Sequence, residues 1–236
     1  MTAGRRYAPV DPDTLPPDPS FDAERGPAIA AERLTPPALR ARFGQALDWQ
    51  VEQSSDGRVF AADRPLRPAA VLIGLREHAQ GLRVLLTVRS VHLQDHAGQI
   101  SFPGGGVEPG DADAVAAALR EAREELRLDA ARIEVLGTLP PYRTVSSFLV
   151  TPVVGLIPAD LPVQADPDEV EEAFEVPLQY LMDSSNHQRR LVTQEERPRA
   201  LYAIEYAADR RYLIWGATAA ILRNFYRFLR AGHRAA

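Results

Sequence analysis

Three glutamates, Glu121, Glu124 and Glu125, are close together in the stretch "LREAREELRL", and Arg120 stands beside them. The alanine-rich run before them predicts a helix, in which these spacings project all three carboxylates from one side. Carboxylates about 6 Å apart repel by about 3 kcal/mol per pair at an effective dielectric near 20, so a divalent cation would stabilise them. Oxygen-only ligands favour Mg²⁺ or Mn²⁺. A solvated charged face is the common alternative for such a run, so the neighbouring residues must decide.

A run of glycines in "FPGGG" precedes this helix. Glycine permits positive φ angles and a close approach of the backbone, so the segment can fold over the start of the helix and present amides to a phosphate. We therefore expect Gly104 and Gly105 to lie against a substrate phosphate. Glycines of this kind on their own are more often only a turn, but beside the carboxylates they predict a metal-pyrophosphate site.

The remaining elements that position this site follow from hydrophobic patterning. Thr35 is the expected N-cap of a short helix with apolar residues at Leu39, Phe43 and Leu47, and two longer amphipathic helices are expected at about 112–126 and 216–231. Asp111 or Asp113 can cap the first of these two. Helices on both sides of a mixed β-sheet indicate an α/β protein with an α/β/α sandwich. Short apolar runs predict strands at 69–75, 82–89, 133–139, 148–157, 200–206 and 211–215.

Composition limits the class of partner and the compartment. The 236 residues carry a formal net charge of −5 and include no cysteine, which excludes disulfides, thiolate metal sites and cysteine catalysis. The acidic balance argues against nucleic acid or a membrane surface, so we expect a small-molecule substrate and leave a homodimer open. The sequence lacks a secretory core and any apolar run of membrane length, which predicts a cytoplasmic protein. Residues 1–33, rich in proline and aspartate, are expected to be a flexible extension without catalytic residues, and residues 34–236 one domain.

The segment "GGVEPGDADAVAAALREAREELRL" resembles the Nudix box, the signature of the Nudix hydrolase family. Two positions depart from the usual pattern. The spacer before Arg120 is one residue longer if Asp111 is the acidic residue of the box, and Arg127 stands where glycine is usual. The longer spacer is a feature of the coenzyme A pyrophosphatase subgroup. The missing glycine implies either a different helix end or a left-handed Arg127, which costs roughly 1 kcal/mol.

A second motif of that subgroup lies upstream, in "LLTVRSVHLQDHAGQISFPGG", where Gln94 replaces the second arginine of the pattern. The resemblance covers roughly residues 34–230. It implies that Ser90 and Gln94 bind substrate together with Gly104 and Gly105. Arg89, placed just after an expected strand, is a candidate to pair with a substrate phosphate through its fork, and a surface salt bridge is an equally supported interpretation. Because Gln94 removes a charge, affinity should fall if this position meets a phosphate. The residues that match the motif are Leu85, Leu86, Thr87, Arg89, Ser90, Gly98, Phe102, Pro103, Gly104 and Gly105.

The resemblance implies a Nudix-type α/β/α sandwich that hydrolyses the pyrophosphate of coenzyme A or acyl-coenzyme A. Glu121, Glu124 and Glu125 would bind Mg²⁺ or Mn²⁺, and Arg120 would orient them. Glu169 is the candidate for a further ligand or the general base, and a solvated carboxylate at a helix start is an equally supported interpretation. The alternatives for function are hydrolysis of another nucleoside diphosphate derivative, such as ADP-ribose, a nucleotide sugar or a dinucleotide, and a non-catalytic ligand sensor.

Three further sets of side chains are candidates for the site. Glu171 and Glu172 are weaker candidates than Glu169 for a further ligand or the general base. His92 and His96 flank Gln94, and the strand before them favours a loop that contacts substrate over a metal site. Tyr212 and Trp215 could stack on a base, but aromatic residues next to an apolar helix usually belong to the core, and we expect them there.

Overall fold

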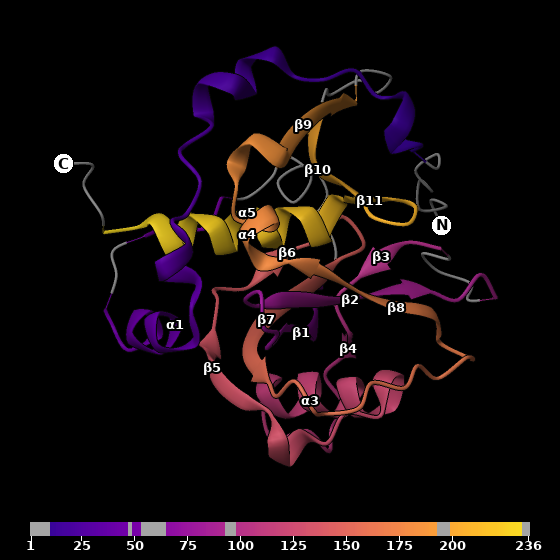
Figure 1. Cartoon of the computed structure of the whole chain (residues 1–236). Coiled ribbons are helices and arrows are strands. Elements are labelled where there is room, and N and C mark those ends of the chain that lie inside the picture. The colour runs from indigo at the N-terminus through magenta and orange to yellow at the C-terminus, as the bar shows by residue number, and fades with distance from the viewer. Residues whose placement is uncertain (1–9, 47–48, 53–64, 93–97, 193–198, 233–236) are drawn as a thin grey trace.

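The computed structural model of the chain describes residues 10–46, 49–52, 65–92, 98–192 and 199–232 (Figure 1). An eight-stranded sheet has the order β3-β2-β1-β7-β5, with β4 paired to β1, β6 to β7 and β8 to β2. A three-stranded sheet has the order β11-β10-β9. The strands are β1 (Arg67–Arg76), β2 (Arg83–Arg89), β3 (Ile100–Ser101), β4 (Gly104–Gly106), β5 (Glu134–Thr138), β6 (Tyr142–Arg143), β7 (Phe148–Ile157), β8 (Val170–Pro177), β9 (His187–Val192), β10 (Arg199–Ala207) and β11 (Arg211–Trp215).

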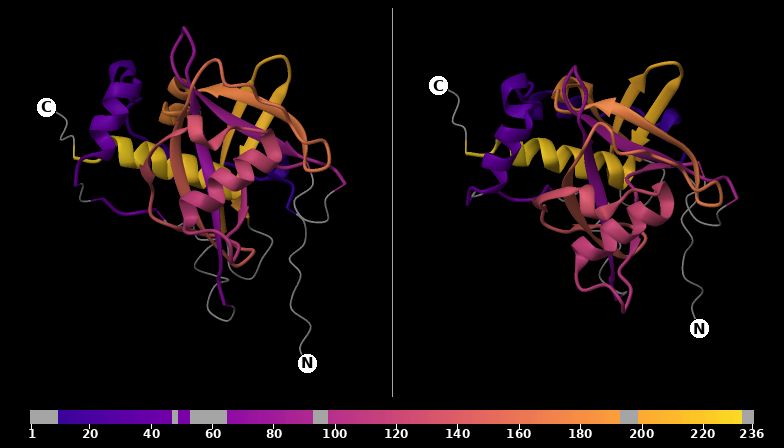
Figure 2. Two further views of the ribbon diagram at one scale, coloured as in Figure 1. Left: turned by 90° about the horizontal axis from the view of Figure 1, so that it is seen from below. Right: turned by 60° about the horizontal axis from the view of Figure 1, so that its bottom comes forward.

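Helices cover both faces of the large sheet. The α-helices are α1 (Pro36–Phe43), α3 (Ala114–Leu126), α4 (Leu178–Leu181) and α5 (Gly216–Arg230). Figures 1 and 2 show α3 and α5 on opposite faces of this sheet, and the small sheet lies on the side of α5. The predicted α/β/α sandwich with a mixed sheet is therefore confirmed. Short 3₁₀ helices are η1 (Pro12–Thr14), η2 (Pro19–Glu24), η3 (Ala31–Leu34), η4 (Ala130–Arg132) and η5 (Ser184–Asn186).

The centre of the large sheet is the parallel pair β1 and β7, which run in register from Arg67↔Phe148 to Arg76↔Ile157. Both strands are nearly continuous apolar runs because each of their faces is covered. Alternate residues therefore enter two separate cores. Ile73 packs in the core shared with α5, and Leu72 packs in the core shared with α3.

Helix α3 begins and ends as its sequence predicts. The Asp113 side chain accepts a hydrogen bond of 2.8 Å from the backbone N–H of Ala116, which makes Asp113 the N-cap of the two candidates. Small alanines let the helix approach the sheet closely, and Ala117, Ala118 and Ala122 are fully buried there. At the C-terminal end Arg127 has φ 57° and ψ 25°, the left-handed conformation that was one of the two alternatives for this position.

The N-terminal segment, predicted as a flexible extension up to residue 33, is packed on the molecule from residue 10 onward. Phe21 and Ile29 each have a relative exposure of 1%. Pro17 forms a bridge with Arg190 at the edge of β9. The prediction of a flexible segment rested on its many prolines and aspartates and gave no weight to these two apolar side chains. We propose that the folded domain begins before residue 34.

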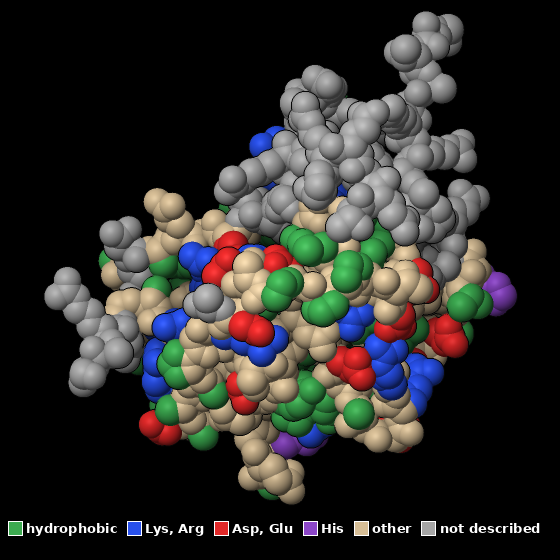
Figure 3. Space-filling view, turned by 90° about the horizontal axis from the view of Figure 1, so that it is seen from above, with side chains coloured by type: hydrophobic (Ala, Val, Ile, Leu, Met, Phe, Trp, Pro, Cys, Tyr) green, Lys and Arg blue, Asp and Glu red, His purple; other side chains and the backbone are tan. Residues whose placement is uncertain are grey.

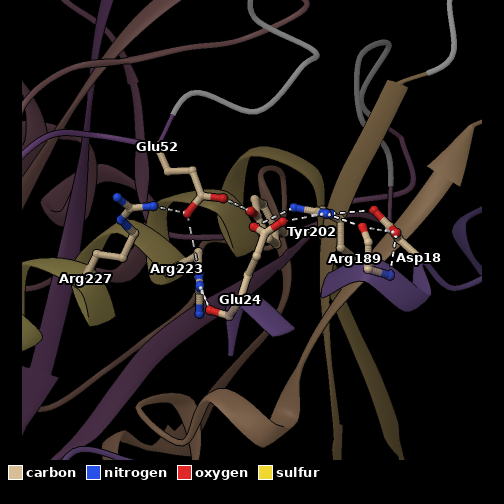
Figure 4. A network of polar contacts seen from close by, with 8 residues as sticks. Asp18, Glu24, Glu52, Arg189, Tyr202, Arg223 and Arg227 are labelled. Atoms are coloured by element: carbon tan, nitrogen blue, oxygen red, sulfur yellow. Dashed lines mark hydrogen bonds and ion pairs between the residues drawn. The ribbon is translucent and has the colours of Figure 1, made fainter. Parts of the chain in front are cut away.

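A polar network joins this segment to β9, β10 and α5 (Figure 4). Arg189 of β9 donates hydrogen bonds to Asp18 at 2.7 Å and to Glu24 at 2.8 Å. Tyr202 of β10 donates a hydrogen bond to Glu52. Burial acts to raise the pKa of Glu52, but its hydrogen-bond donors and nearby arginines outweigh burial and hold that pKa below the usual value. Seen from above, acidic and basic side chains are interspersed on the surface, the pattern that paired charges produce (Figure 3). None of the helices in the described ranges combines the length and apolar character that spanning a membrane requires.

Candidate active site

Three carboxylates from two distant segments meet beside β4. Glu121 and Glu125 come from α3, and Glu169 comes from the turn before β8. One oxygen atom of each lies within 4.8 Å of one oxygen of the other two. Glu125 is buried, Glu121 is half-buried and Glu169 is exposed, so the group extends from the protein interior to the surface. Such a set of oxygen donors fits a hard divalent cation.

Glu125 is the most enclosed of the three, with 3% of its surface exposed. The backbone N–H of Gly104 hydrogen-bonds to its carboxylate, and the Arg89 Nη1 atom lies 4.0 Å from its Oε1 atom. Its other oxygen, Oε2, is buried and has no hydrogen-bond partner among the described residues. Burial raises the pKa of Glu125 to about 8, with Arg89 opposing the shift and the Glu121 and Glu169 carboxylates adding to it. A buried polar atom normally has a partner, and a bound cation would supply one for this oxygen.

Glu121 is held against the glycine segment. Burial raises the pKa of Glu121, Arg120 opposes the rise, and the Glu124 and Glu169 carboxylates add to it. The three glycines form strand β4, paired with Ala69–Val71 of β1, and are therefore not the loop that was expected. In this position the Gly104 N–H bonds to the Glu125 carboxylate, and Gly105 lies close to the Glu121 carboxylate. Their binding to a substrate phosphate stays a prediction.

Arg120 joins the helix to the segment before it. Its guanidinium donates to Asp111 at 3.0 Å and 3.1 Å, to the backbone oxygen of Gly106 at 2.9 Å and to Glu121 at 3.1 Å. The hydrogen bond with Asp111 is the largest cause of a raised Arg120 pKa and a lowered Asp111 pKa. The fork of an arginine suits this bidentate pair. The orienting role expected for Arg120 stays a prediction.

Glu124 does not join the three-carboxylate group in this structure. Its side chain is 45% exposed and accepts a hydrogen bond of 2.8 Å from Arg120. The third member of the group is Glu169, which the sequence interpretation named separately as a further ligand or the general base. Metal binding by Glu124 therefore stays a prediction that would need its side chain to change rotamer.

Glu169 belongs to a turn that docks on α3 and on β2. Its backbone oxygen accepts a hydrogen bond of 2.9 Å from the N–H of Ser90. The residues after it form strand β8, so Glu169 is not at a helix start, although its side chain is exposed as the alternative of a solvated carboxylate expects. The strand has a β-bulge where its pairing passes from Val88↔Glu172 to Arg89↔Val170, and bulges commonly redirect side chains next to active sites.

The other candidates are distributed around this group. Arg89 is half-buried at the end of β2, near Glu125, while Ser90 is buried. Gln94 and His96 lie outside the described residues. His92 is exposed and is not part of the three-carboxylate group. Tyr212 is 4% exposed and stacks on Phe174 with a centroid distance of 4.0 Å, so it belongs to the core as expected, and Trp215 is half-buried.

Asp166 is a residue of this region that the sequence interpretation missed. Its backbone N–H donates a hydrogen bond of 2.8 Å to the Glu125 carbonyl oxygen, and its side chain accepts one of 2.6 Å from Arg127. The signal was the turn-forming sequence "DPD" before Glu169. That signal predicts a turn but not its contact with the end of α3.

Comparison with known proteins identifies the family. A model described as "NUDIX domain" matches residues 65–195. The uncharacterized Nudix hydrolase NudL of Escherichia coli K12 is 45% identical over 159 residues, which cover 67% of this chain and 80% of NudL. The NudL protein of Shigella boydii serotype 18 is 44% identical over 159 residues.

Solved structures with partial similarity include two hydrolases. A binary complex of Caenorhabditis elegans Ap4A hydrolase has a TM-score of 0.41 and 24% identity, and covers 48% of this chain and 82% of that one. The Nudix hydrolase RenU of Mycobacterium smegmatis has a TM-score of 0.42 and 22% identity, and covers 56% of this chain and 80% of that one.

The chain belongs to the Nudix family. It is a Nudix pyrophosphohydrolase, an enzyme that acts on nucleoside diphosphate derivatives. Nudix hydrolases generally need divalent metal ions. The donor set of Glu121, Glu125 and Glu169 fits this need, because it offers only carboxylate oxygens and includes one with no other partner among the described residues.

The raised pKa of Glu125 gives a pH-dependent stability in the metal-free protein. The folded chain keeps a proton on Glu125 up to about pH 8, whereas the unfolded chain loses it near the usual value of 4.5. The folded state therefore binds more protons in this window, and the contribution of Glu125 to the free energy of unfolding falls as pH rises. In EDTA, we expect wild type to lose stability relative to Glu125→Gln between pH 5 and pH 8, as measured by urea denaturation. Parallel stability curves for the two proteins would contradict the raised pKa.

Proposed function

We propose that this enzyme hydrolyses the pyrophosphate bond of coenzyme A or an acyl-coenzyme A. The products are adenosine 3′,5′-bisphosphate and 4′-phosphopantetheine, or its acyl form. Water supplies the oxygen that forms the new P–O bond, the bridging P–O bond breaks, and the proton leaves to a base. The observation that carries the proposal is the three-carboxylate group beside β4. Arg89, at the end of β2, lies next to this group. The two linked motifs of the coenzyme A pyrophosphatase subgroup support the choice of substrate.

Each side chain of the site has a defined task in this proposal. Glu121 and Glu125 hold a divalent ion such as Mg²⁺ or Mn²⁺, with Glu169 as a third ligand or as the base that takes the proton from water. When bound, such an ion polarises the phosphates and lowers the pKa of a coordinated water. Arg120 fixes the Glu121 side chain through its own bond to Asp111.

Substrate contacts are proposed for residues of the upstream motif and for two glycines of β4. Arg89 is exposed enough to reach a phosphate, and its fork allows two parallel hydrogen bonds to one. Ser90, Gln94, Gly104 and Gly105 complete the proposed binding set. These positions match the upstream motif, apart from Gln94, where an arginine is usual.

A second candidate function follows from Gln94. Because glutamine removes a charge from the motif, the preferred substrate could be a different nucleoside diphosphate derivative, such as ADP-ribose, a nucleotide sugar or a dinucleotide. A non-catalytic ligand sensor is disfavoured, since Arg120, Glu121, Glu124 and Glu125 of the box are all present.

Product analysis tests the proposal directly. The full chain is incubated with coenzyme A and Mn²⁺, and the products are separated by chromatography and identified by mass spectrometry. We expect adenosine 3′,5′-bisphosphate and 4′-phosphopantetheine in equal amounts. A parallel panel contains ADP-ribose, a nucleotide sugar and a dinucleoside polyphosphate. Faster metal-dependent turnover of any of these than of coenzyme A would reject the first choice of substrate, and tight ligand binding without product would favour the sensor.

A further inference from the structure

Arg127 adopts a backbone conformation that is unfavourable for a residue with a side chain. It follows the last residue of α3 with φ 57°, the left-handed region in which glycine is the preferred residue. Its N–H closes the helix by donating to the Arg123 carbonyl oxygen at 3.0 Å. A strained residue at the edge of a site is a reason to ask what its side chain does there.

The Arg127 side chain bonds to the turn that carries Glu169. Its Nη2 atom lies 2.6 Å from the Oδ2 atom of Asp166. Asp166 organises this turn, because its side chain accepts from the N–H of Asp168 at 3.1 Å and its carbonyl oxygen accepts from the N–H of Glu169 at 3.1 Å. The turn also touches the helix end at the Glu125 carbonyl oxygen, which accepts from the N–H of Asp166 at 2.8 Å. Arg127 and this backbone bond therefore attach the turn to α3 at two points.

We propose that Arg127 is a positioning residue that fixes the turn 166–169 on α3 and thereby places Glu169 beside Glu121 and Glu125. The inference rests on the proposed metal site. Glu121 and Glu125 are set by the helix itself, whereas Glu169 is exposed and belongs to a turn. Its place therefore depends on how that turn is attached to α3 and, through the Ser90 N–H, to the end of β2.

Electrostatics alone predicts the opposite effect of removing Arg127. A guanidinium near a cation site repels the cation, so losing this charge should strengthen metal binding slightly. Loss of a positioning contact should weaken it. Arg123, one turn earlier on the same helix, is exposed and forms no ion pair with any described residue. It therefore provides a matched control for the loss of charge.

The experiment measures Mn²⁺ binding to the full chain by isothermal titration calorimetry at low ionic strength, with thermal unfolding as a second readout. Arg127→Gly suits the left-handed backbone, so we expect a melting temperature equal to or above that of wild type. We expect its Mn²⁺ dissociation constant to rise about three- to fivefold, the upper part of the range that the loss of an exposed ion pair allows. Arg123→Ala should bind Mn²⁺ as tightly as wild type or slightly more tightly.

A second background shows whether Arg127 acts through Glu169. In Glu169→Gln, which lacks the carboxylate to be positioned, adding Arg127→Gly should weaken Mn²⁺ binding no further. Unchanged or tighter Mn²⁺ binding by Arg127→Gly in the wild-type background would overturn the inference, as would the same loss in both backgrounds. If wild type itself binds no Mn²⁺, or if Glu125→Gln binds it equally well, the proposed metal site fails instead.

Discussion

Replacing Glu125 with glutamine should lower turnover of coenzyme A by at least about 100-fold while leaving the fold intact. The substitution keeps the size of the side chain and an oxygen that can accept from Gly104, but it removes the charge that a metal ligand needs. Because the carboxylate is buried and holds its proton up to about pH 8 without metal, a neutral amide should be tolerated in its place. Steady-state kinetics with Mn²⁺ and circular dichroism measure the two effects separately.

Two neighbouring glutamates serve as comparisons for this prediction. Glu171→Gln removes a charge from an exposed position of β8 that is outside the three-carboxylate group, and its kinetics should match wild type. Glu124→Gln changes a residue paired with Arg120, so its loss of activity should be smaller than that of Glu125→Gln. Near-normal turnover by Glu125→Gln would show that this residue is not a metal ligand. A larger loss for Glu124→Gln would mean that Glu124 turns inward when metal is bound.

Elements with strong hydrophobic patterns were predictable from the sequence. Strand β7 and helix α5 appear within one residue of their expected limits, because a fully covered strand is continuously apolar and an amphipathic helix repeats every 3.6 residues. The clustering of Glu121 and Glu125 was predictable for the same reason, since both lie on one helix. The end of α3 at a left-handed Arg127 was one of two stated alternatives.

The strands and contacts that were missed depend on tertiary structure. Strand β8 reads "VEEAFEVP", and its bulge near Glu171 breaks the alternation by which a strand is recognised. Strand β4 consists of three glycines, which have no side-chain pattern to show pairing with β1. The approach of Glu169 to Glu125 joins segments 44 residues apart, and it depends on the contact of Asp166 with the helix end. A single sequence contains no local signal for such a contact.

The three glycines of β4 should respond differently to alanine, because each would place a Cβ atom against a different neighbour. A Cβ at Gly105 would lie 2.6 Å from the Glu121 Cδ atom, so Gly105→Ala must push that carboxylate away from the group. A displacement of about 1 Å at a catalytic group can cost about 100-fold in rate, and we expect a loss of about 10- to 100-fold without unfolding. At Gly106 a Cβ meets nothing within 4 Å, so Gly106→Ala is the matched control and should keep wild-type kinetics.

Gly104→Ala should instead damage the fold. Its Cβ would lie 2.7 Å from the Val71 Cα atom, and this backbone of β1 cannot move aside as a flexible side chain can. We expect the free energy of unfolding to fall by about 1–3 kcal/mol, the usual effect of overpacking. Urea denaturation and coenzyme A turnover of the three variants separate the two kinds of loss. Equal activity of Gly105→Ala and Gly106→Ala would show that the place of Glu121 against β4 does not matter for catalysis, because only the first substitution crowds that carboxylate.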